Sequence, residues 1–176
     1  MPLRIPEQPD HPVESVDQIP DRLIAAGVLR LDREGRWLIG DGPITHPKLK
    51  AFLWRHLMRN REGQYWIVNG PQRVLVEFED TPLIVRHVFA ENGALMFELG
   101  DGSVEPLPDD GLLLRPDGGL VATVACGRYG DTERRGHAAR LTRTAVADLA
   151  TWLDEDGDGT PCLKLGERMW PIRAEM

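Results

Sequence analysis

The sequence has few of the features that define secreted, membrane-spanning and disulfide-rich proteins. Its 176 residues include only two cysteines, Cys126 and Cys162, which is too few for a disulfide framework. No apolar run approaches the roughly 20 residues that a membrane-spanning helix needs. The first 20 residues are dense in proline and lack the apolar core of a secretory signal. These absences predict a cytoplasmic, reduced protein with no membrane partner.

Positive charge is also scarce. The chain has 21 Lys and Arg against 28 Asp and Glu, a formal net charge of −7. General affinity for nucleic acid depends on clustered Lys and Arg, so we expect no nucleic-acid partner. Hydrophobic residues make up 41% and charged residues 28%, the balance of an ordinary globular protein.

Side chains for catalysis or metal binding do not form recognisable motifs. The five histidines have no metal-ligand spacing, and neither serine, Ser15 or Ser103, lies in a nucleophile elbow. Gly40-Asp41-Gly42 resembles part of a phosphate-binding loop but lacks the third glycine, and Pro43 removes a backbone donor. The sequence therefore predicts no catalytic residue, no cofactor and no metal.

One acidic segment resembles the start of a calcium-binding loop. Asp154, Asp156 and Asp158 occupy the first, third and fifth positions of an EF-hand pattern, and Gly159 the sixth. The twelfth position is Leu165 instead of Glu, and no second helix follows. A plain connection is the favoured interpretation, and calcium binding is the alternative.

The pattern of turns and apolar residues predicts an α+β protein with two small domains. Glycine-containing turns separate short apolar strands, and Leu49, Phe52, Leu53 and Leu57 have helical spacing after His46-Pro47. A second helix is expected at 143–153, after a long polar loop at 127–136. Thr81-Pro82 suggests a boundary. The predicted parts are a proline-rich arm at 1–20, an α+β domain at 21–82 and a second α+β domain at 83–176.

Two parts of the sequence also resemble each other. A shift of 96 residues aligns two helix-plus-hairpin units without a gap, with matches at the helix core, the turn after the helix and the hairpin turn: Ala51 with Ala147, Leu53 with Leu149, Leu57 with Leu153, Gly63 with Gly159 and Gly70 with Gly166. The order of elements repeats as well, so a duplicated strand-helix-hairpin motif is our interpretation. Chance convergence is the alternative.

Three kinds of side chain could carry function. His56 lies in the apolar helix stripe, where a hydrogen-bonded core histidine is expected, and Cys126 is expected to be a buried thiol. Several arginines of this acidic chain lie near strand ends or in the long loop: Arg73, Arg86, Arg128, Arg134, Arg135 and Arg140. Arginine binds phosphate and carboxylate through a bidentate fork, so a local anion site is one interpretation. Surface pairing with Glu77, Glu79 and Glu133 is the other.

Two stretches resemble a known family. The chain is similar to the bacterial domain of unknown function 1285 over most of residues 35–85 and over the C-terminal 35 residues, through Gly35-Arg36-Trp37, Gly42-Pro43-Ile44, Phe52, Tyr65-Trp66-Ile67-Val68, Val76-Glu77, Glu79-Asp80-Thr81-Pro82 and Gly166–Ile172. It also resembles, more loosely, uncharacterised protein family 0598, through Asn60-Arg61, Gly63, Tyr65, Gly70, Arg73, Glu79-Asp80 and Pro82.

The first resemblance implies a duplicated α+β architecture with a second domain of the pleckstrin-homology type. It also implies a nucleotide-like ligand between the domains and a role in signalling. This sequence departs from that family's pattern at His46, where arginine is frequent, at Arg73, where lysine is frequent, and at Lys164-Leu165, which replace a tryptophan–serine pair.

The sequence thus favours a non-enzymatic ligand-binding or regulatory protein for an anionic small molecule. Arg73 and Arg86 are the expected anion partners, Asp80 the carboxylate that orients a donor, and Trp37, Tyr65 and Trp170 the stacking or wall residues. A protein–protein interaction module that uses the proline-rich arm is the alternative, and an enzyme with an unrecognised site is a third reading.

Overall fold

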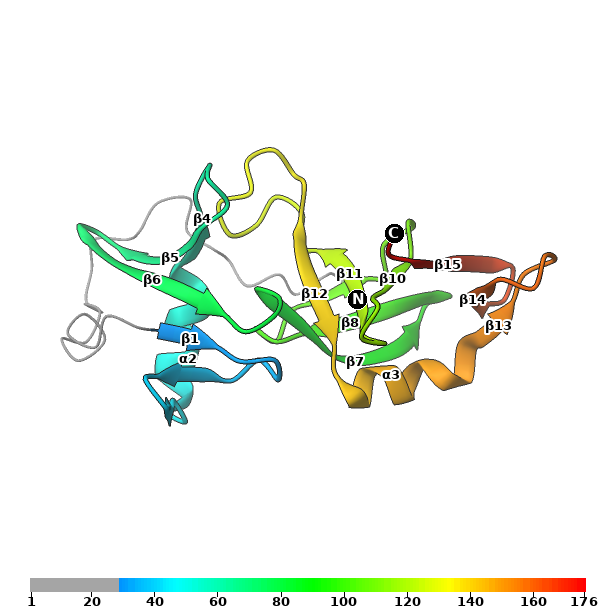
Figure 1. Cartoon of the computed structure of the whole chain (residues 1–176), viewed down its shortest axis with the longest axis horizontal. Coiled ribbons are helices and arrows are strands. Elements are labelled where there is room, and N and C mark those ends of the chain that lie inside the picture. Colours follow the sequence, from blue (N-terminus) through cyan, green and yellow to red (C-terminus); the bar gives the residue numbers. More distant parts are fainter. Residues whose placement is uncertain (1–28) are drawn as a thin grey trace. The chain divides into compact units, whose positions relative to one another are not determined.

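The computed structural model describes residues 29–176 of the chain. These residues form fifteen strands, two α-helices and one 3-10 turn, and the strands lie in two mixed sheets (Figure 1). The predicted α+β class is therefore confirmed, with β-sheet as the larger part. The predicted arm at residues 1–20 lies outside the described residues.

The first sheet has the strand order β3-β2-β1-β6-β5-β4. Strand β1 is parallel to β6, and the other neighbours are antiparallel. Helix α2 (Pro47–His56) packs against β5 and begins with proline, whose missing N–H is not needed in a first turn. The strands are β1 (Leu29–Leu31), β2 (Trp37–Ile39), β3 (Gly42–Pro43), β4 (Leu57–Arg59), β5 (Tyr65–Asn69) and β6 (Gln72–Phe78).

The second sheet has the order β13-β14-β15-β10-β11-β12-β7-β8-β9. Helix α3 (Arg143–Leu149) packs against β7 and continues into the 3-10 turn η1 (Ala150–Trp152). Thr142 caps α3, because its hydroxyl accepts the N–H of Ala145 at 3.2 Å. The strands are β7 (Leu83–Glu91), β8 (Ala94–Leu99), β9 (Val104–Pro106), β10 (Leu112–Leu114), β11 (Leu120–Val124), β12 (His137–Leu141), β13 (Leu153–Glu155), β14 (Pro161–Leu165) and β15 (Arg168–Ala174).

The same order of elements occurs twice. The series β1, β2, β3, α2, β4, β5, β6 has its counterpart in β10, β11, β12, α3, β13, β14, β15, and each series follows the same order within its sheet. From the helices onward the offset is 96 residues, and the strand register agrees: Leu57 pairs with Ile67 as Leu153 pairs with Leu163. We call residues 29–78 the first repeat, and residues 112–124 with 137–174 the second repeat.

The turn between the first two strands after each helix has the same hydrogen bonds in both repeats. Asn60 Oδ1 accepts the backbone N–H groups of Glu62 and Gln64 at 3.0 and 2.9 Å. Asp156 Oδ1 accepts those of Asp158 and Thr160, both at 2.9 Å. The acidic segment at 154–159 thus comprises the end of β13 and most of the turn that connects β13 to β14. Within residues 29–176, no three His, Cys, Asp or Glu side chains gather where they could hold a metal ion.

The repeats differ in one connection. Gly40 and Asp41 link β2 to β3, whereas a twelve-residue segment, Ala125–Gly136, links β11 to β12. We call this segment the Asp131 loop. In the described chain it groups with residues 29–82 as one compact unit, the first unit, while residues 83–124 and 137–176 form the second unit. The domain boundaries expected from the sequence, and the pleckstrin-homology likeness, stay predictions.

Each unit has an apolar core. That of the first unit contains Leu29, Leu31, Trp37, Leu53, Leu57 and Ile67, and that of the second contains Leu83, Phe97, Leu163 and Trp170. His56 is buried with its Nδ1 3.0 Å from the Val68 carbonyl oxygen, so the prediction of a hydrogen-bonded core histidine is confirmed. The prediction for Cys126 is wrong: this thiol is exposed in the Asp131 loop, whereas Cys162 is buried. No helix among the described residues is both long and apolar enough to span a membrane.

Candidate functional site

The six residues selected from the sequence fall into both units. The first unit contains Trp37, Tyr65, Arg73 and Asp80, and the second contains Arg86 and Trp170. Trp37 and Trp170 are each only 1% exposed and belong to the cores. Tyr65 is buried too, with its ring edge-on to Phe78 at 4.9 Å between centroids.

The two selected arginines are exposed, and Asp80 is half-buried just after β6. No ion pair or side-chain hydrogen bond joins Arg73 or Arg86 to another residue within 29–176. Other arginines of the predicted set are paired: Arg140 lies 2.9 Å from Asp117, and Arg135 lies 2.7 Å from Glu133. Arg73 and Arg86 therefore keep their charge available to a ligand. The ligand-binding roles of all six residues stay predictions.

Arg73 borders a hollow of about 280 Å³ in the first unit. The hollow lies on strands β4, β5 and β6 and is lined by Met58, Arg59, Asn60, Trp66, Val68 and Arg73. Met58 pairs with Trp66 across β4 and β5, and Val68 pairs with Arg73 across β5 and β6. Paired residues share a face of a sheet, so these four side chains come together on one face.

The opposite face of the same strands belongs to the core. Tyr65 and Ile67 alternate with Trp66 along β5 and are buried, as are their partners Val76 and Val74 on β6. Trp66 is the half-buried ring of this strand. The sheet thus separates the packed aromatic residue, Tyr65, from the one that borders the hollow, Trp66.

Arg59 lies at the rim of the hollow, but its charge is engaged. Its guanidinium donates to Asp131 Oδ1 at 2.6 Å and to the Gly136 carbonyl oxygen at 2.8 Å. Burial raises the pKa of the nearby Tyr65 hydroxyl, and the charge of Arg59 opposes this. Arg73 is consequently the arginine of this hollow whose guanidinium makes no ion pair within residues 29–176.

Asp131 organises the loop that holds Arg59. Its side chain is fully buried and accepts the backbone N–H groups of Gly127, Arg135 and Gly136 in addition to Arg59. Burial alone would raise the pKa of this carboxyl group. The three backbone donors and the Arg59 charge outweigh it and hold the pKa at about 2.

The loop also closes the edge of β4. The Arg59 N–H donates to the Tyr129 carbonyl oxygen at 2.7 Å, and Tyr129 is only 1% exposed. Gly130, with φ of 73°, approaches so closely that a Cβ there would lie 2.8 Å from the Arg59 carbonyl oxygen and 3.6 Å from Met58 Cε. Only glycine satisfies both the left-handed backbone and this approach.

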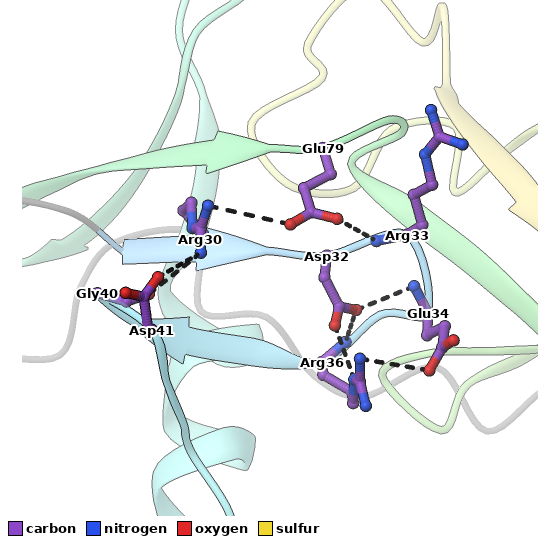
Figure 2. Close-up of polar contacts among 8 residues, drawn as sticks. All are labelled: Arg30, Asp32, Arg33, Glu34, Arg36, Gly40, Asp41 and Glu79. Carbon is purple, nitrogen blue, oxygen red and sulfur yellow. Dashed lines mark hydrogen bonds and ion pairs between the residues drawn. The ribbon is translucent and has the colours of Figure 1, made fainter.

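A second group of charges lies at the β1–β2 hairpin (Figure 2). Arg30 is 3.5 Å from Asp41 and 4.0 Å from Glu79, and Glu79 Oε2 accepts the Arg33 N–H at 3.4 Å. Asp32 accepts the N–H of Glu34 and both the N–H and Nε of Arg36. Burial tends to raise the pKa of Asp32, but these hydrogen bonds lower it overall. Because these side chains hold the hairpin to the end of β6, we assign them a structural role.

Sequence reasoning found Arg73 but missed the other five residues that line the hollow: Met58, Arg59, Asn60, Trp66 and Val68. A signal for Trp66 was present, since alternation along Tyr65-Trp66-Ile67 places one ring on each face of a strand. No local pattern indicated Arg59, because its partner Asp131 is 72 residues away.

Solved structures place this fold in a known class. The chain is similar to the crystal structure of a DUF1285 family protein from Silicibacter pomeroyi DSS-3, with TM-score 0.63 and 19% identity over 82% of this chain and 79% of that one. It is also similar to a DUF1285 family protein from Shewanella baltica OS155, with TM-score 0.53 and 16% identity over 70% of this chain and 90% of that one. The resemblance to this family is confirmed, and at these identities it establishes the fold.

The family model that matches the sequence covers residues 13–161 and is described as Protein of unknown function (DUF2946). The match spans most of the chain, so the chain belongs to this family. No curated protein matches the sequence significantly.

Proposed function

We propose that the protein is a non-enzymatic, ligand-binding regulatory protein that takes up an anionic, nucleotide-like small molecule in the hollow on β4, β5 and β6. Arg73 binds the anionic group and Trp66 supplies a ring for stacking. The observation that carries the proposal is the position of an uncommitted arginine and a half-buried indole on one sheet face.

The chemistry of the lining supports this class of ligand. A guanidinium binds phosphate or carboxylate oxygens through two parallel hydrogen bonds. Trp66 stands across from Met58, and Val68 adds further apolar surface. A ligand with a planar apolar part and an anionic end matches this combination of surfaces.

Size and charge narrow the ligand further. About 280 Å³ is just below the usual range for small-molecule sites, which favours a ligand no larger than a mononucleotide. Since Asp131 neutralises Arg59, the arginines of the hollow contribute one uncompensated positive charge. A ligand that presents one dominant anionic group fits best.

The other expectations from the family resemblance belong to the same proposal. The two repeats share a common origin by duplication, the second domain is of the pleckstrin-homology type, and the ligand acts in signalling. The 96-residue offset, with matching strand register and turn hydrogen bonds, supports the common origin.

A thermal-shift screen with nucleotides, other phosphorylated metabolites and inorganic phosphate tests the function. We expect stabilisation by at least one nucleotide-like compound. In calorimetry Arg73→Ala should weaken its binding by about tenfold or more, as expected for loss of a charge-assisted hydrogen bond. Arg73→Lys should retain part of the affinity because it keeps the charge but loses the bidentate fork.

Arg55→Ala is the matched control. Arg55 is also an exposed arginine of the first unit, but it lies on α2 and does not line the hollow. Its substitution should leave binding unchanged. Arg86→Ala tests separately the role predicted for Arg86 from the sequence. No stabilisation by any compound, or equal binding by Arg73→Ala and the unsubstituted protein, would contradict the proposal.

A further inference from the structure

The Asp131 loop contacts the strand that forms one wall of the hollow. Its Tyr129 carbonyl accepts the Arg59 N–H at 2.7 Å, and its Asp131 accepts the Arg59 guanidinium at 2.6 Å. Gly130 lies against the Arg59 backbone and close to Met58 Cε. Met58 and Arg59 both line the hollow. The loop therefore holds two of the six lining residues in place.

The loop conformation is specified over its whole length. Six of its residues have positive φ values between 51° and 81°: Ala125, Gly127, Tyr129, Gly130, Arg134 and Gly136. Three of these are not glycine, and such conformations persist only where surrounding contacts hold them. Asp131 provides those contacts, since it binds the loop backbone at Gly127, Arg135 and Gly136. Backbone hydrogen bonds within the loop add to these contacts, so the loop is a strained segment that one buried carboxylate helps to hold.

The two ends of the loop continue into strands of the second unit. Residue 125 follows β11 and residue 136 precedes β12, and these strands pair with each other from Val121–Arg140 to Val124–His137. The loop is therefore covalently continuous with one end of the β11–β12 pair.

From these contacts we propose that the Asp131 loop is a latch whose docking on β4 is coupled to the shape of the hollow. The docked loop holds Met58 and Arg59 in the arrangement that forms the hollow, and a ligand in the hollow stabilises the docked loop. Coupling of this kind is reciprocal, so release of the loop disturbs the hollow even without ligand. The ligand-dependent half rests on the function proposed above, and the ligand-free half does not.

Hydrogen exchange measured by mass spectrometry tests the ligand-free half. Gly130→Ala places a Cβ 2.8 Å from the Arg59 carbonyl oxygen and should release the loop. We expect faster exchange by about tenfold in segments 125–136 and 57–69. Gly118→Ala is the matched control, because Gly118 has φ of 80° but no atom within 4 Å of the added Cβ. It should leave both segments unchanged.

Cys126 provides the second readout. It is exposed in the loop, whereas Cys162 is buried, and burial together with Asp154 and Asp156 raises the pKa of the Cys162 thiol. A maleimide fluorophore should therefore label Cys126 selectively. Adenosine 5′-monophosphate is the probe ligand, since it combines a planar base with a phosphate. We expect a saturable fluorescence change with the dissociation constant found by calorimetry, and its loss in Asp131→Asn.

The outcomes separate the latch from the proposed function. Faster exchange confined to 125–136 in Gly130→Ala, with 57–69 unchanged, overturns the latch whether or not a ligand binds. Binding of the probe without a fluorescence change also overturns it. Failure of every compound to bind, with exchange altered in both segments, contradicts the proposed function and leaves the ligand-free coupling supported.

Discussion

Met58, Trp66 and Arg73 line the hollow of the first repeat, whereas the corresponding residues of the second repeat are Asp154, Cys162 and Met169. The strand order, the register and the turn hydrogen bonds are the same in the two repeats. What differs is the chemistry of the same sheet face, which is cationic and aromatic in the first repeat and carries an Asp154–Lys164 ion pair in the second. The two repeats therefore share their core and turn pattern but not the chemistry of this face.

The edge strands of the two repeats are protected in different ways. In β4 the Arg59 N–H is bonded to the Tyr129 carbonyl oxygen of the Asp131 loop. In β13 the corresponding N–H, that of Glu155, is bonded to the side chain of the adjacent Asp154 at 2.8 Å. A charged, self-bonded edge discourages pairing with other strands. The first repeat therefore depends on a distant segment, and the second protects its edge with its own residues.

The largest effect should come from removing the carboxylate that holds the Asp131 loop. Asp131→Ala leaves the half-buried Arg59 charge and three backbone N–H groups without their acceptor, and should cost about 3 kcal/mol of unfolding free energy. Asp41→Ala is the comparison in the corresponding connection of the first repeat. Its ion pair with Arg30 is fully exposed on the Asp41 side, so urea denaturation should detect little change. Similar losses of unfolding free energy in both variants would show that the Asp131 loop contributes no more to stability than the corresponding connection of the first repeat.

Corresponding leucines should respond very differently. Leu57 is 0% exposed and Leu153 is 60% exposed, although they occupy the same position in the two repeats. Leu57→Ala should lose about 2–5 kcal/mol by leaving a cavity. Leu153→Ala should stay within about 0.5 kcal/mol of the unsubstituted protein. Denaturant titration of both variants measures the contrast, and equal losses would mean that Leu153 is covered in solution.

Lowering the pH should reduce the unfolding free energy because Asp131 becomes protonated. Its pKa is about 2 in the folded chain against an ordinary value of 3.8, so the stabilisation is complete above pH 4 and is lost as the pH falls toward 2. The shift corresponds to about 2 kcal/mol. Urea midpoints between pH 6 and pH 2 should show this loss, and Asp131→Asn should remove that part of the slope. An unchanged slope in Asp131→Asn would assign the acid sensitivity to other carboxylates.

The smallest effect should be the same in both repeats. Asn60→Ala and Asp156→Ala each remove an acceptor for two backbone N–H groups of an exposed turn, and each should cost about 1 kcal/mol. Asp156→Asn should be nearly neutral, because an amide oxygen can accept the same bonds. Thermal unfolding of the three variants checks the equivalence. A much larger loss of stability at one turn than at the other would show that the two turns are not energetically equivalent.

These comparisons explain which parts of the structure could be predicted from the sequence. Turn residues and strand alternation are local signals, and they are present at the β1–β2, β5–β6 and β14–β15 hairpins. Strand β4 was missed because Leu57 continues the helical spacing of Leu49 and Leu53. The predicted helix therefore included residues that form β4. Strand β12 was missed because it follows a long polar loop with no turn signal of its own.

The candidate site was less accessible to sequence reasoning. Arg73 was recognised because a charge at a strand end is a local feature. Trp37 and Trp170 were selected as wall residues, but tryptophan fills cores as readily as it lines pockets, and each is 1% exposed. The role of Asp131 depends on pairing with Arg59 across 72 residues, which no local pattern encodes.

The separation of the Asp131 loop from residues 29–82 along the chain has a consequence for synthesis. A ribosome releases all of the first repeat, and then β7 to β11, before residue 136 emerges. During that interval the N–H of Arg59 has no Tyr129 carbonyl to bond, and β4 is an open edge in a nascent chain. Exposed strand edges are the sites at which incomplete chains associate. The edge of β4 can therefore be completed only after 58 residues beyond the end of β6 have been synthesised, and until then it is open to association with other chains.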